Sequence, residues 1–243
     1  GDKVKVGTLL AEAGGFVSAP IYSSVSGTVF KVDQSIDATG YRKPCIIINV
    51  EGDEWEESID RTDKLETVEA HPELTPEEIV NRIKVAGVTG MGGAGFPTFI
   101  KLCPPPGAKA ECVIINGVEC EPYITADYRL MMEHADEILV GLNLLMKAAK
   151  VEKGYIGIED NKPAAIKLFE EKTADDSRIE IVPLAKKYPQ GGEKQLVDAV
   201  IRRQVPAPPA IPVNVGAIVQ NVGTAFAVYQ AVMKNKPLFE RYT

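Results

Sequence analysis

Apolar residues in the first part of the chain come in short runs that are separated by turn residues. The runs span residues 4–6, 8–11, 27–32 and 45–50. Runs of this kind, rich in valine, isoleucine and threonine and bounded by glycine, proline or serine, are typical of β-strands. We therefore predict a small all-β unit over residues 1–55.

The next stretch, residues 56–76, is acid-rich, lacks apolar periodicity and ends in a segment with two prolines, which indicates a linker. A helix is predicted directly after it. Thr75 as N-cap, Pro76 at the first helical position and Glu78 three residues after the cap form a helix-start signature. We expect Ile79, Val80 and Ile83 to form the buried face of this helix. The helix is expected to end at Gly87.

Strand-like apolar runs then alternate with helical patterns. The runs cover residues 112–116, 155–158 and 179–184, and the helical patterns cover 125–150, 161–172, 191–203 and 221–234. The segment 205–212 is rich in proline, which excludes a central strand or a helix interior there. Such alternation predicts an α/β domain over residues 77–243, with a mostly parallel sheet and helices packed on its faces.

Composition narrows the classes of function. The 34 acidic and 27 basic residues give a net charge of -7, so no broad basic surface for nucleic acid is predicted. The apolar runs fall far short of the roughly 20 residues that a membrane-spanning helix needs. The four cysteines show no CxxC or CxxxC pair, and the two histidines, His71 and His134, lie far apart, so no metal site is predicted. Because the chain starts at Gly1 without a methionine, we expect further sequence at both ends.

The segment 90–98 is the most unusual in the chain. Gly90, Gly92 and Gly95 fit GxGxxG, but a helix is expected before them where a dinucleotide fingerprint needs a strand. What remains is that peptide N–H groups without side chains can approach an anion or a planar ring closely. Residues 97–98 can open a short helix whose N-terminus favours phosphate, and Lys101 is expected to reach the same anion. A tightly turning structural loop is the alternative.

Three further loops carry compatible chemistry. Loop 116–122 follows a predicted strand and offers one amide and two carboxylates, and ligands of open α/β sheets bind beyond the carboxyl ends of strands. Loop 188–195 again places glycines beside a carboxylate, and loop 220–224 opens the last helix with polar residues. Taken singly, an acidic surface turn or simple helix capping would explain them. Tyr188 either stacks on a ring or fills the core, and Cys120 is expected to be a buried structural thiol.

Two resemblances emerge from these segments. The strand and turn pattern of residues 1–12 and 18–29 resembles the barrel-sandwich hybrid fold of lipoyl and biotinyl carriers, although residues 22–26 lack the acceptor lysine, which favours a structural or docking role. The four loops occur in the order seen in the flavin-binding subunit of respiratory complex I. The match is closer to the RnfC family, one of the components of the Rnf ion-translocating electron transport complex, and it covers essentially the whole chain.

The resemblance implies which residues bind which ligand. It implies an FMN cofactor near one set of residues, with Lys101 at its phosphate: Gly90, Gly92, Gly93, Ala94, Gly95, Lys101, Asn116, Glu119, Asn221 and Thr224. It implies contacts to NADH as substrate from Phe96, Glu121 and Glu193. The chain departs from complex I relatives at Met91, Leu102 and Gly192, where they carry arginine, tryptophan and glutamate, and this weakens the expected nucleotide contacts.

The resemblance also implies an activity and its setting. Hydride would pass from NADH to FMN, and electrons would leave through 4Fe-4S clusters that only the full-length family carries. The implied partners are the other Rnf subunits, with ferredoxin reached through the complex, at the cytoplasmic face of a bacterial membrane. Without the cluster region, this stretch is expected to bind its ligands without handing electrons onward. The alternative is a flavin-free scaffold that resembles the A component of the sodium-pumping quinone reductase.

Overall fold

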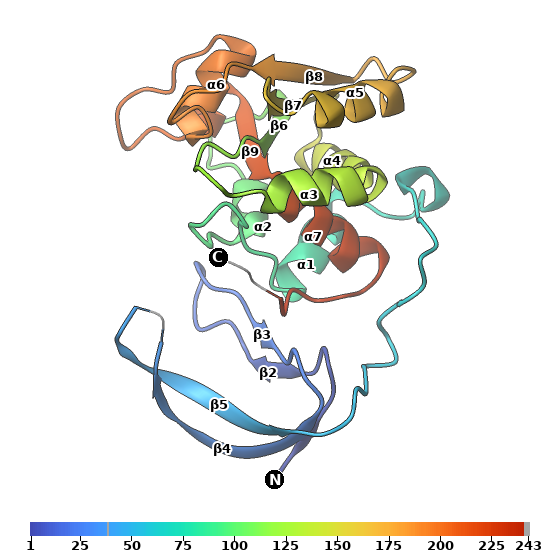
Figure 1. Ribbon diagram of the computed structural model, residues 1–243, viewed down its shortest axis with the longest axis vertical. Helices are drawn as coiled ribbons and strands as arrows, with labels where there is room; N and C mark the ends of the chain where they lie inside the picture. The colour runs from blue at the N-terminus through green and yellow to red at the C-terminus, as the bar shows by residue number, and fades with distance from the viewer. Residues whose placement is uncertain (38, 241–243) are drawn as a thin grey trace.

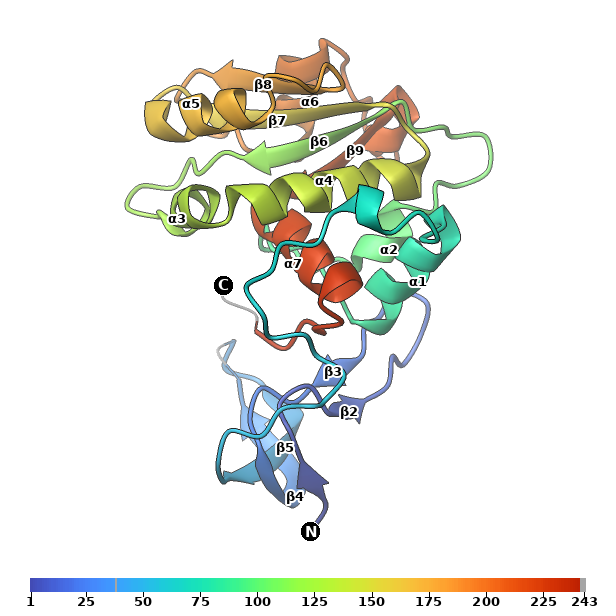
Figure 2. The same ribbon diagram turned by 90° about the vertical axis from the view of Figure 1, so that its right-hand side faces the viewer.

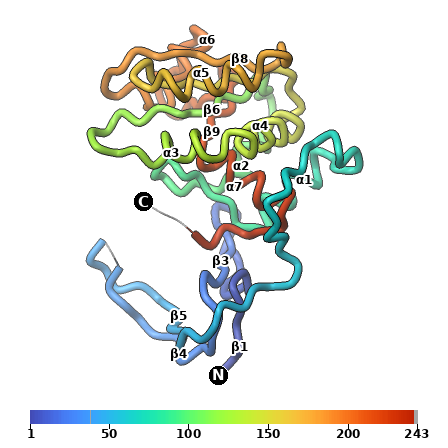
Figure 3. The backbone as a smooth tube through the Cα atoms, turned by 45° about the vertical axis from the view of Figure 1, so that its right-hand side comes forward, coloured from blue at the N-terminus to red at the C-terminus, as the bar shows by residue number. Residues whose placement is uncertain are grey.

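The first part of the chain contains strands and no helix within the described residues, which are 1–37 and 39–240 of this computed structural model (Figure 1). Its strands are β1 (Lys3–Val4), β2 (Leu9–Ala11), β3 (Ile21–Tyr22), β4 (Gly27–Ile36) and β5 (Arg42–Val50). β1, β4 and β5 form one antiparallel sheet, and β2 pairs with β3. The prediction of an all-β unit is confirmed, and Figure 3 shows the long β4–β5 hairpin as an arm extending from the remainder of the chain.

The segment that follows β5 is fastened to the far end of the chain. It contains the short 3-10 helix η1 (Val68–Ala70). Lys234, only 6% exposed, donates from Nζ to Asp60 Oδ2 at 2.8 Å and to the Lys64 carbonyl oxygen at 2.5 Å. This bond to Lys234 is the main cause that lowers the pKa of Asp60 to about 2. The ring of Trp55 also meets that of Phe239 edge-on, with centroids 5.7 Å apart.

Helix α1 (Pro76–Val85) begins and ends where the sequence predicts. The Glu78 backbone N–H donates to Thr75 Oγ1 at 3.1 Å, so Thr75 is the N-cap. The last helical residue is Val85, Ala86 is the C-cap, and Gly87 follows with φ +68°, a left-handed conformation that glycine adopts without strain. Ile79 and Ile83 are fully buried, as expected, and Val80 is partly buried against the same core.

The remaining helices match the predicted pattern with one difference. They are α2 (Thr98–Lys101), α3 (Ala126–Glu133), α4 (Ala135–Ala149), α5 (Pro163–Lys172), α6 (Glu193–Ile201) and α7 (Val222–Met233), with the 3-10 helix η2 (Pro212–Val215). The single helix predicted over 125–150 is wrong. His134, with φ -132° and ψ 37°, separates α3 from α4, and the apolar periodicity continues across this break, which hides it in the sequence.

All four strands of the central sheet run parallel, in the order β8-β7-β6-β9. They are β6 (Cys112–Gly117), β7 (Lys153–Glu159), β8 (Ile179–Leu184) and β9 (Ala217–Asn221). The sequence predicts the first three and misses β9, because its five residues run directly into α7 without an intervening turn. The register places Asn116 of β6 opposite Asn221 of β9, so two predicted loops meet at the carboxyl end of the sheet.

Helices cover both faces of this sheet (Figure 2). The larger core lies on the face covered by α4, α5 and α7, with α1 packed against α4 and α7, and the smaller core lies under α6. Helices α4 and α7 cross in close contact at Gly141, where a Cβ atom would lie 2.0 Å from the Ala225 carbonyl oxygen. This crossing holds the N-terminus of α7 against the sheet.

Candidate functional site

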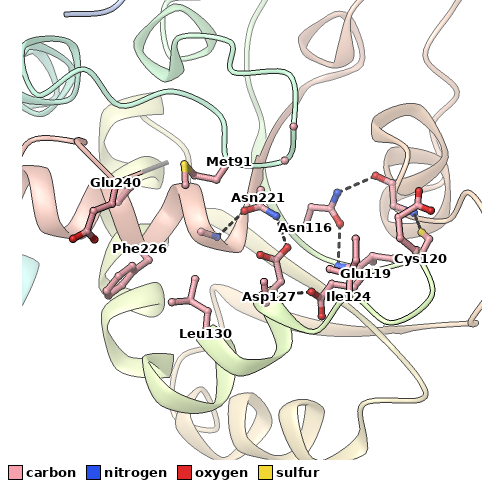
Figure 4. Close-up of a pocket in the computed structure, with 18 of the residues that line it drawn as sticks. Met91, Asn116, Glu119, Cys120, Ile124, Asp127, Leu130, Asn221, Phe226 and Glu240 are labelled. Carbon is pink, nitrogen blue, oxygen red and sulfur yellow. Dashed lines mark hydrogen bonds between the residues drawn. The ribbon is translucent and has the colours of Figure 1, made fainter. Parts of the chain in front are cut away.

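A cavity of about 710 Å³ lies at the carboxyl ends of β6 and β9. It is lined by parts of all four predicted loops, by α3 and α7, and by residues 236–240 near the end of the described chain. In Figure 4, Asn116 and Cys120 lie at one end of this space, and Leu130 and Phe226 lie at the other. The sequence-predicted residues that line the cavity are Gly92, Gly93, Asn116, Glu119, Glu121 and Asn221.

Asn116 ties the second loop to the third. Its Nδ2 donates to the Gly191 carbonyl oxygen at 2.9 Å, and its Oδ1 accepts from the Val118 N–H at 3.1 Å. The Gly191 N–H in turn donates to Cys120 Sγ at 2.9 Å. A Cβ on Gly191 would lie 3.2 Å from that sulfur, so glycine permits the close approach. Cys120 is half-buried and lines the cavity, which corrects the expectation that it is fully buried.

The first and fourth loops are joined at the start of α7. Asn221 caps this helix, because its Oδ1 accepts from the Gly223 N–H at 2.7 Å. The Met91 N–H donates to Oγ1 of the fully buried Thr224 at 2.9 Å. A Cβ on Gly223 would lie 3.3 Å from the Cβ of Met91, so a side chain there would push the two loops apart. Thr224 therefore positions the glycine loop from below and does not line the cavity.

The glycine loop is a tight reversal closed by its own backbone. The Gly90 N–H donates to the Phe96 carbonyl oxygen at 2.8 Å, and the Thr98 N–H donates to the Val88 carbonyl oxygen at 3.0 Å. Gly93 and Gly95 have φ values of +104° and +61°, which side chains rarely adopt. Four of the predicted residues in this loop do not line the cavity: Gly90, Ala94, Gly95 and Phe96.

Lys101 and Glu193 contact each other. Lys101 Nζ donates to Glu193 Oε1 at 2.6 Å and to the Val219 carbonyl oxygen at 3.1 Å. The resemblance assigns these residues to two different ligands, and neither lines the cavity. The structure therefore brings together a cation and an anion that lie 92 positions apart in the chain.

Tyr188 lines the cavity from the third loop and is 71% exposed, so the interpretation that it fills the core is wrong. Glu121 lines the cavity from the second loop and is exposed. Glu119 acts as a cap for α3, since its two carboxylate oxygens accept from the Asp127 N–H at 2.8 Å and the Tyr128 N–H at 3.0 Å. These bonds fix Glu119 at the cavity edge.

Asp127, which no sequence pattern predicts as a site residue, lines the cavity from the first turn of α3. Its Oδ2 accepts from Asn221 Nδ2 at 2.6 Å (Figure 4). Burial raises the pKa of Asp127 to about 6, aided by the charge of Glu119 and opposed by the bond from Asn221. An acidic residue in the first turn of a helix is common, so the sequence gives no signal for this role.

Glu159 ends β7 and is 1% exposed, and neither of its carboxylate oxygens has a hydrogen-bond partner. Burial raises the pKa of this carboxyl group, and the charges of Glu119 and Asp160 add to the effect, while the charge of Lys162 and the nearby backbone N–H of Glu119 oppose it. A buried carboxylate without partners is costly in its charged form, and proton binding removes the cost.

Replacement of Glu159 by glutamine is expected to flatten the dependence of stability on pH. Because the pKa of Glu159 is raised in the folded protein above the ordinary 4.5, the folded protein binds more protons than the unfolded chain above pH 4.5. The free energy of unfolding of the wild type therefore falls as pH rises through the folded pKa, by about 1.4 kcal/mol for each tenfold gain in proton affinity on folding. Urea unfolding at pH 5 and pH 8 measures this loss, which Glu159→Gln should reduce to the part that comes from other groups such as Asp127, whereas the exposed control Glu170→Gln should keep it in full.

Two kinds of feature are missing from the part of the chain that the structure describes. Within residues 1–37 and 39–240, no three histidine, cysteine or acidic side chains are grouped so as to hold a metal ion. Nor does any helix in those residues combine the length and the apolar character that a bilayer crossing requires.

A parallel sheet whose carboxyl edge carries a glycine loop, two asparagines and a helix N-terminus belongs to the class of open α/β domains, which bind ligands at that edge. Residues 83–230 match the family described as Nuo51 FMN-binding domain, and residues 1–53 match the RnfC barrel sandwich hybrid domain. The chain therefore belongs to the Nuo51 FMN-binding domain family, with an RnfC-type domain in front. The resemblance and the fold expected from it are confirmed.

Similar proteins carry related names. The chain is 44% identical over 244 residues to the C component of the proton-translocating ferredoxin:NAD(+) oxidoreductase complex of Clostridium ljungdahlii, covering 100% of this chain and 52% of the relative. It is 43% identical over 243 residues to the Na(+)-translocating counterpart of Acetobacterium woodii, covering 100% of this chain and 53% of the relative. The chain thus spans about half the length of these relatives. An NAD+-reducing [NiFe]-hydrogenase structure in the H2-reduced state matches with a TM-score of 0.58 and 27% identity, over 65% of this chain and 31% of that chain.

Proposed function

We propose that this chain binds FMN in the cavity at the carboxyl edge of the sheet and accepts hydride there from NADH. The observation that carries the proposal is the convergence of four loops, distant in sequence, on one space between Asn116 and Asn221. Membership of an FMN-binding domain family supports the identity of the cofactor.

The residues present fit an FMN. The cavity of about 710 Å³ lies within the size range of cofactor sites. Gly92 and Gly93 present bare backbone to it, and a Cβ added at Gly93 would meet nothing within 4 Å, so a planar group can approach the peptide there. Amide and carboxylate groups at the same edge, on Asn116 and Asp127, match the mixed donors and acceptors of a flavin ring and its ribityl chain.

The predicted ligands are kept, with four of the cofactor residues moved from direct contact to support. Gly92, Gly93, Asn116, Glu119 and Asn221 would hold the cofactor, supported by Gly90, Ala94, Gly95 and Thr224 behind them. Glu121, Phe96 and Glu193 would contact NADH, and Lys101 would meet the phosphate. Bound FMN supplies the redox chemistry, since it accepts a hydride and can release electrons singly. The contribution of the chain is to hold donor and acceptor in contact and to exclude water.

The wider setting is proposed from the names of the relatives, which are subunits of ferredoxin:NAD(+) oxidoreductase complexes that translocate protons or Na(+). We infer that this chain is part of an electron-transfer subunit of such a complex and that the other subunits are its partners. Ferredoxin, the coupled ion, the iron–sulfur clusters and a peripheral position at the cytoplasmic face of the membrane belong to this same proposal.

Fluorescence titration with FMN, followed by addition of NADH without oxygen, tests the proposal. We expect saturable flavin binding and bleaching of the bound flavin by NADH. Lys101→Ala should weaken FMN binding about tenfold, because a charge-assisted bond to phosphate is lost. Glu193→Gln should leave FMN binding intact, because Lys101 loses only a competing carboxylate, while weakening the response to NADH.

Binding of FMN with no bleaching by NADH would refute the hydride step alone. A wild-type chain that folds and does not bind FMN would favour the flavin-free scaffold. In that case Lys101→Ala would have no effect on any flavin signal.

A further inference from the structure

Three carboxyl side chains interact electrostatically near the carboxyl end of the sheet, and two of them, Glu119 and Asp127, line the cavity. Glu119 follows β6, Glu159 ends β7 and Asp127 lies in the first turn of α3. The backbone N–H groups of α3 already occupy both oxygens of Glu119, and its charge acts on both of the other two groups. The charge of Glu119 thus raises the pKa of both Asp127 and Glu159.

The charges around this cluster are mostly negative. Asp160 adds a further carboxylate beside Glu159, and Lys162 is the cation that acts on it. The Lys162 ammonium group lies 4.9 Å from the centroid of the Tyr128 ring. From α7, the neutral amide of Asn221 faces Asp127. If a further negative charge entered the cavity, or if water left it, the state in which all three carboxyl groups are ionised would become less favourable. One of the three groups would then bind a proton.

Asp127 is the group placed to bind that proton. Glu159 is 1% exposed and does not line the cavity, whereas Asp127 does. Oδ2 of Asp127 is engaged by Asn221 Nδ2 at 2.6 Å, so a proton would bind Oδ1. Near pH 7 a group with a pKa of about 6 is mostly ionised, so it can still gain a proton.

We propose that Asp127 takes up a proton from solvent when FMN fills the cavity, which turns its carboxylate from a hydrogen-bond acceptor into a donor towards the ligand. The inference rests on the proposed function. It involves no electron transfer, and the one bond formed is O–H on Asp127. Two effects of the ligand drive it, since FMN excludes water from Asp127 and carries the negative charge of its phosphate.

Calorimetric titration of FMN in buffers of different ionisation enthalpy counts the protons taken up. At pH 7 the wild type should take up as much as about 0.9 proton per FMN more than Asp127→Asn does. Its FMN affinity should fall by as much as tenfold per pH unit above pH 7, relative to the variant. Ionisation of the FMN phosphate itself contributes equally to both proteins. Asparagine keeps an oxygen for Asn221, and Asp175→Asn, an exposed position, is the control that should behave as the wild type.

Equal proton uptake by the wild type and Asp127→Asn, with FMN bound to both, would overturn this inference and leave the proposed function standing. Failure of the wild type to bind FMN at any pH would overturn both. Carbon-13 NMR titration of the flavin-free wild type tests the inference without a variant, so it remains informative if Asp127→Asn does not fold. Titration of the Asp127 carboxyl near pH 6 supports the inference, and titration near the ordinary 3.8 contradicts it.

Discussion

Replacement of Gly141 by alanine should lower the free energy of unfolding by about 3 kcal/mol, at the upper end for overpacked cores. A Cβ at this position would lie 2.0 Å from the Ala225 carbonyl oxygen and 2.6 Å from its carbon. Both are backbone atoms of α7, so relief requires the two helices to separate. The sign is informative, because glycine-to-alanine replacement inside a helix ordinarily stabilises it by about 1 kcal/mol.

Urea unfolding followed by circular dichroism measures this loss. The matched control is Gly14→Ala, where a Cβ would meet nothing within 4 Å and which should change stability by less than about 0.5 kcal/mol. A Gly141→Ala protein as stable as the wild type would mean that α4 and α7 are not in backbone contact. The position of Asn221 at the start of α7 would then need another explanation.

The change Asn116→Asp should reduce FMN affinity roughly a hundredfold, or by about 3 kcal/mol. The two side chains have the same shape, but aspartate loses the Nδ2 donor and places a carboxylate oxygen against the Gly191 carbonyl oxygen. Repulsion between these oxygens would separate the third loop from the second and open the cavity wall. Fluorescence titration with FMN measures the loss.

Asn143→Asp is the matched control for this change. Its Nδ2 likewise donates to a backbone carbonyl, that of Leu139, on a helix away from the cavity. Arg178 donates to its Oδ1 and would pair with the new charge. FMN affinity should stay within about twofold of the wild type. Equal losses in both variants would indicate general destabilisation.

The sequence predicts elements whose signals are local. Thr75, Pro76 and Glu78 locate the start of α1 because capping involves neighbours in the chain, and Gly87 locates its end for the same reason. The strand β9 is missed because its residues lead straight into the apolar α7. The break at His134 is missed because a single change of backbone dihedral angles leaves the apolar periodicity intact.

The candidate site shows the same division. The sequence supplies four loops, and the resemblance orders them around one ligand. Neither the sequence nor the resemblance predicts the ion pair between Lys101 and Glu193. This pair depends on how β9 brings the end of α2 to the start of α6. Asp127 and Glu159 are missed because their unusual state arises from burial next to Glu119, and burial is a property of the fold.

The clamp formed by Lys234 and Asp60 bears on how the front domain can move. Neighbouring domains in one chain generally shift relative to each other unless something prevents it. Here a buried ammonium group and the Trp55–Phe239 contact fasten the connecting segment to the chain just after α7, the helix whose first residues shape the cavity. A protein seated on the β4–β5 arm would thus keep one orientation towards the cavity, unlike the freely swinging arms of carrier domains.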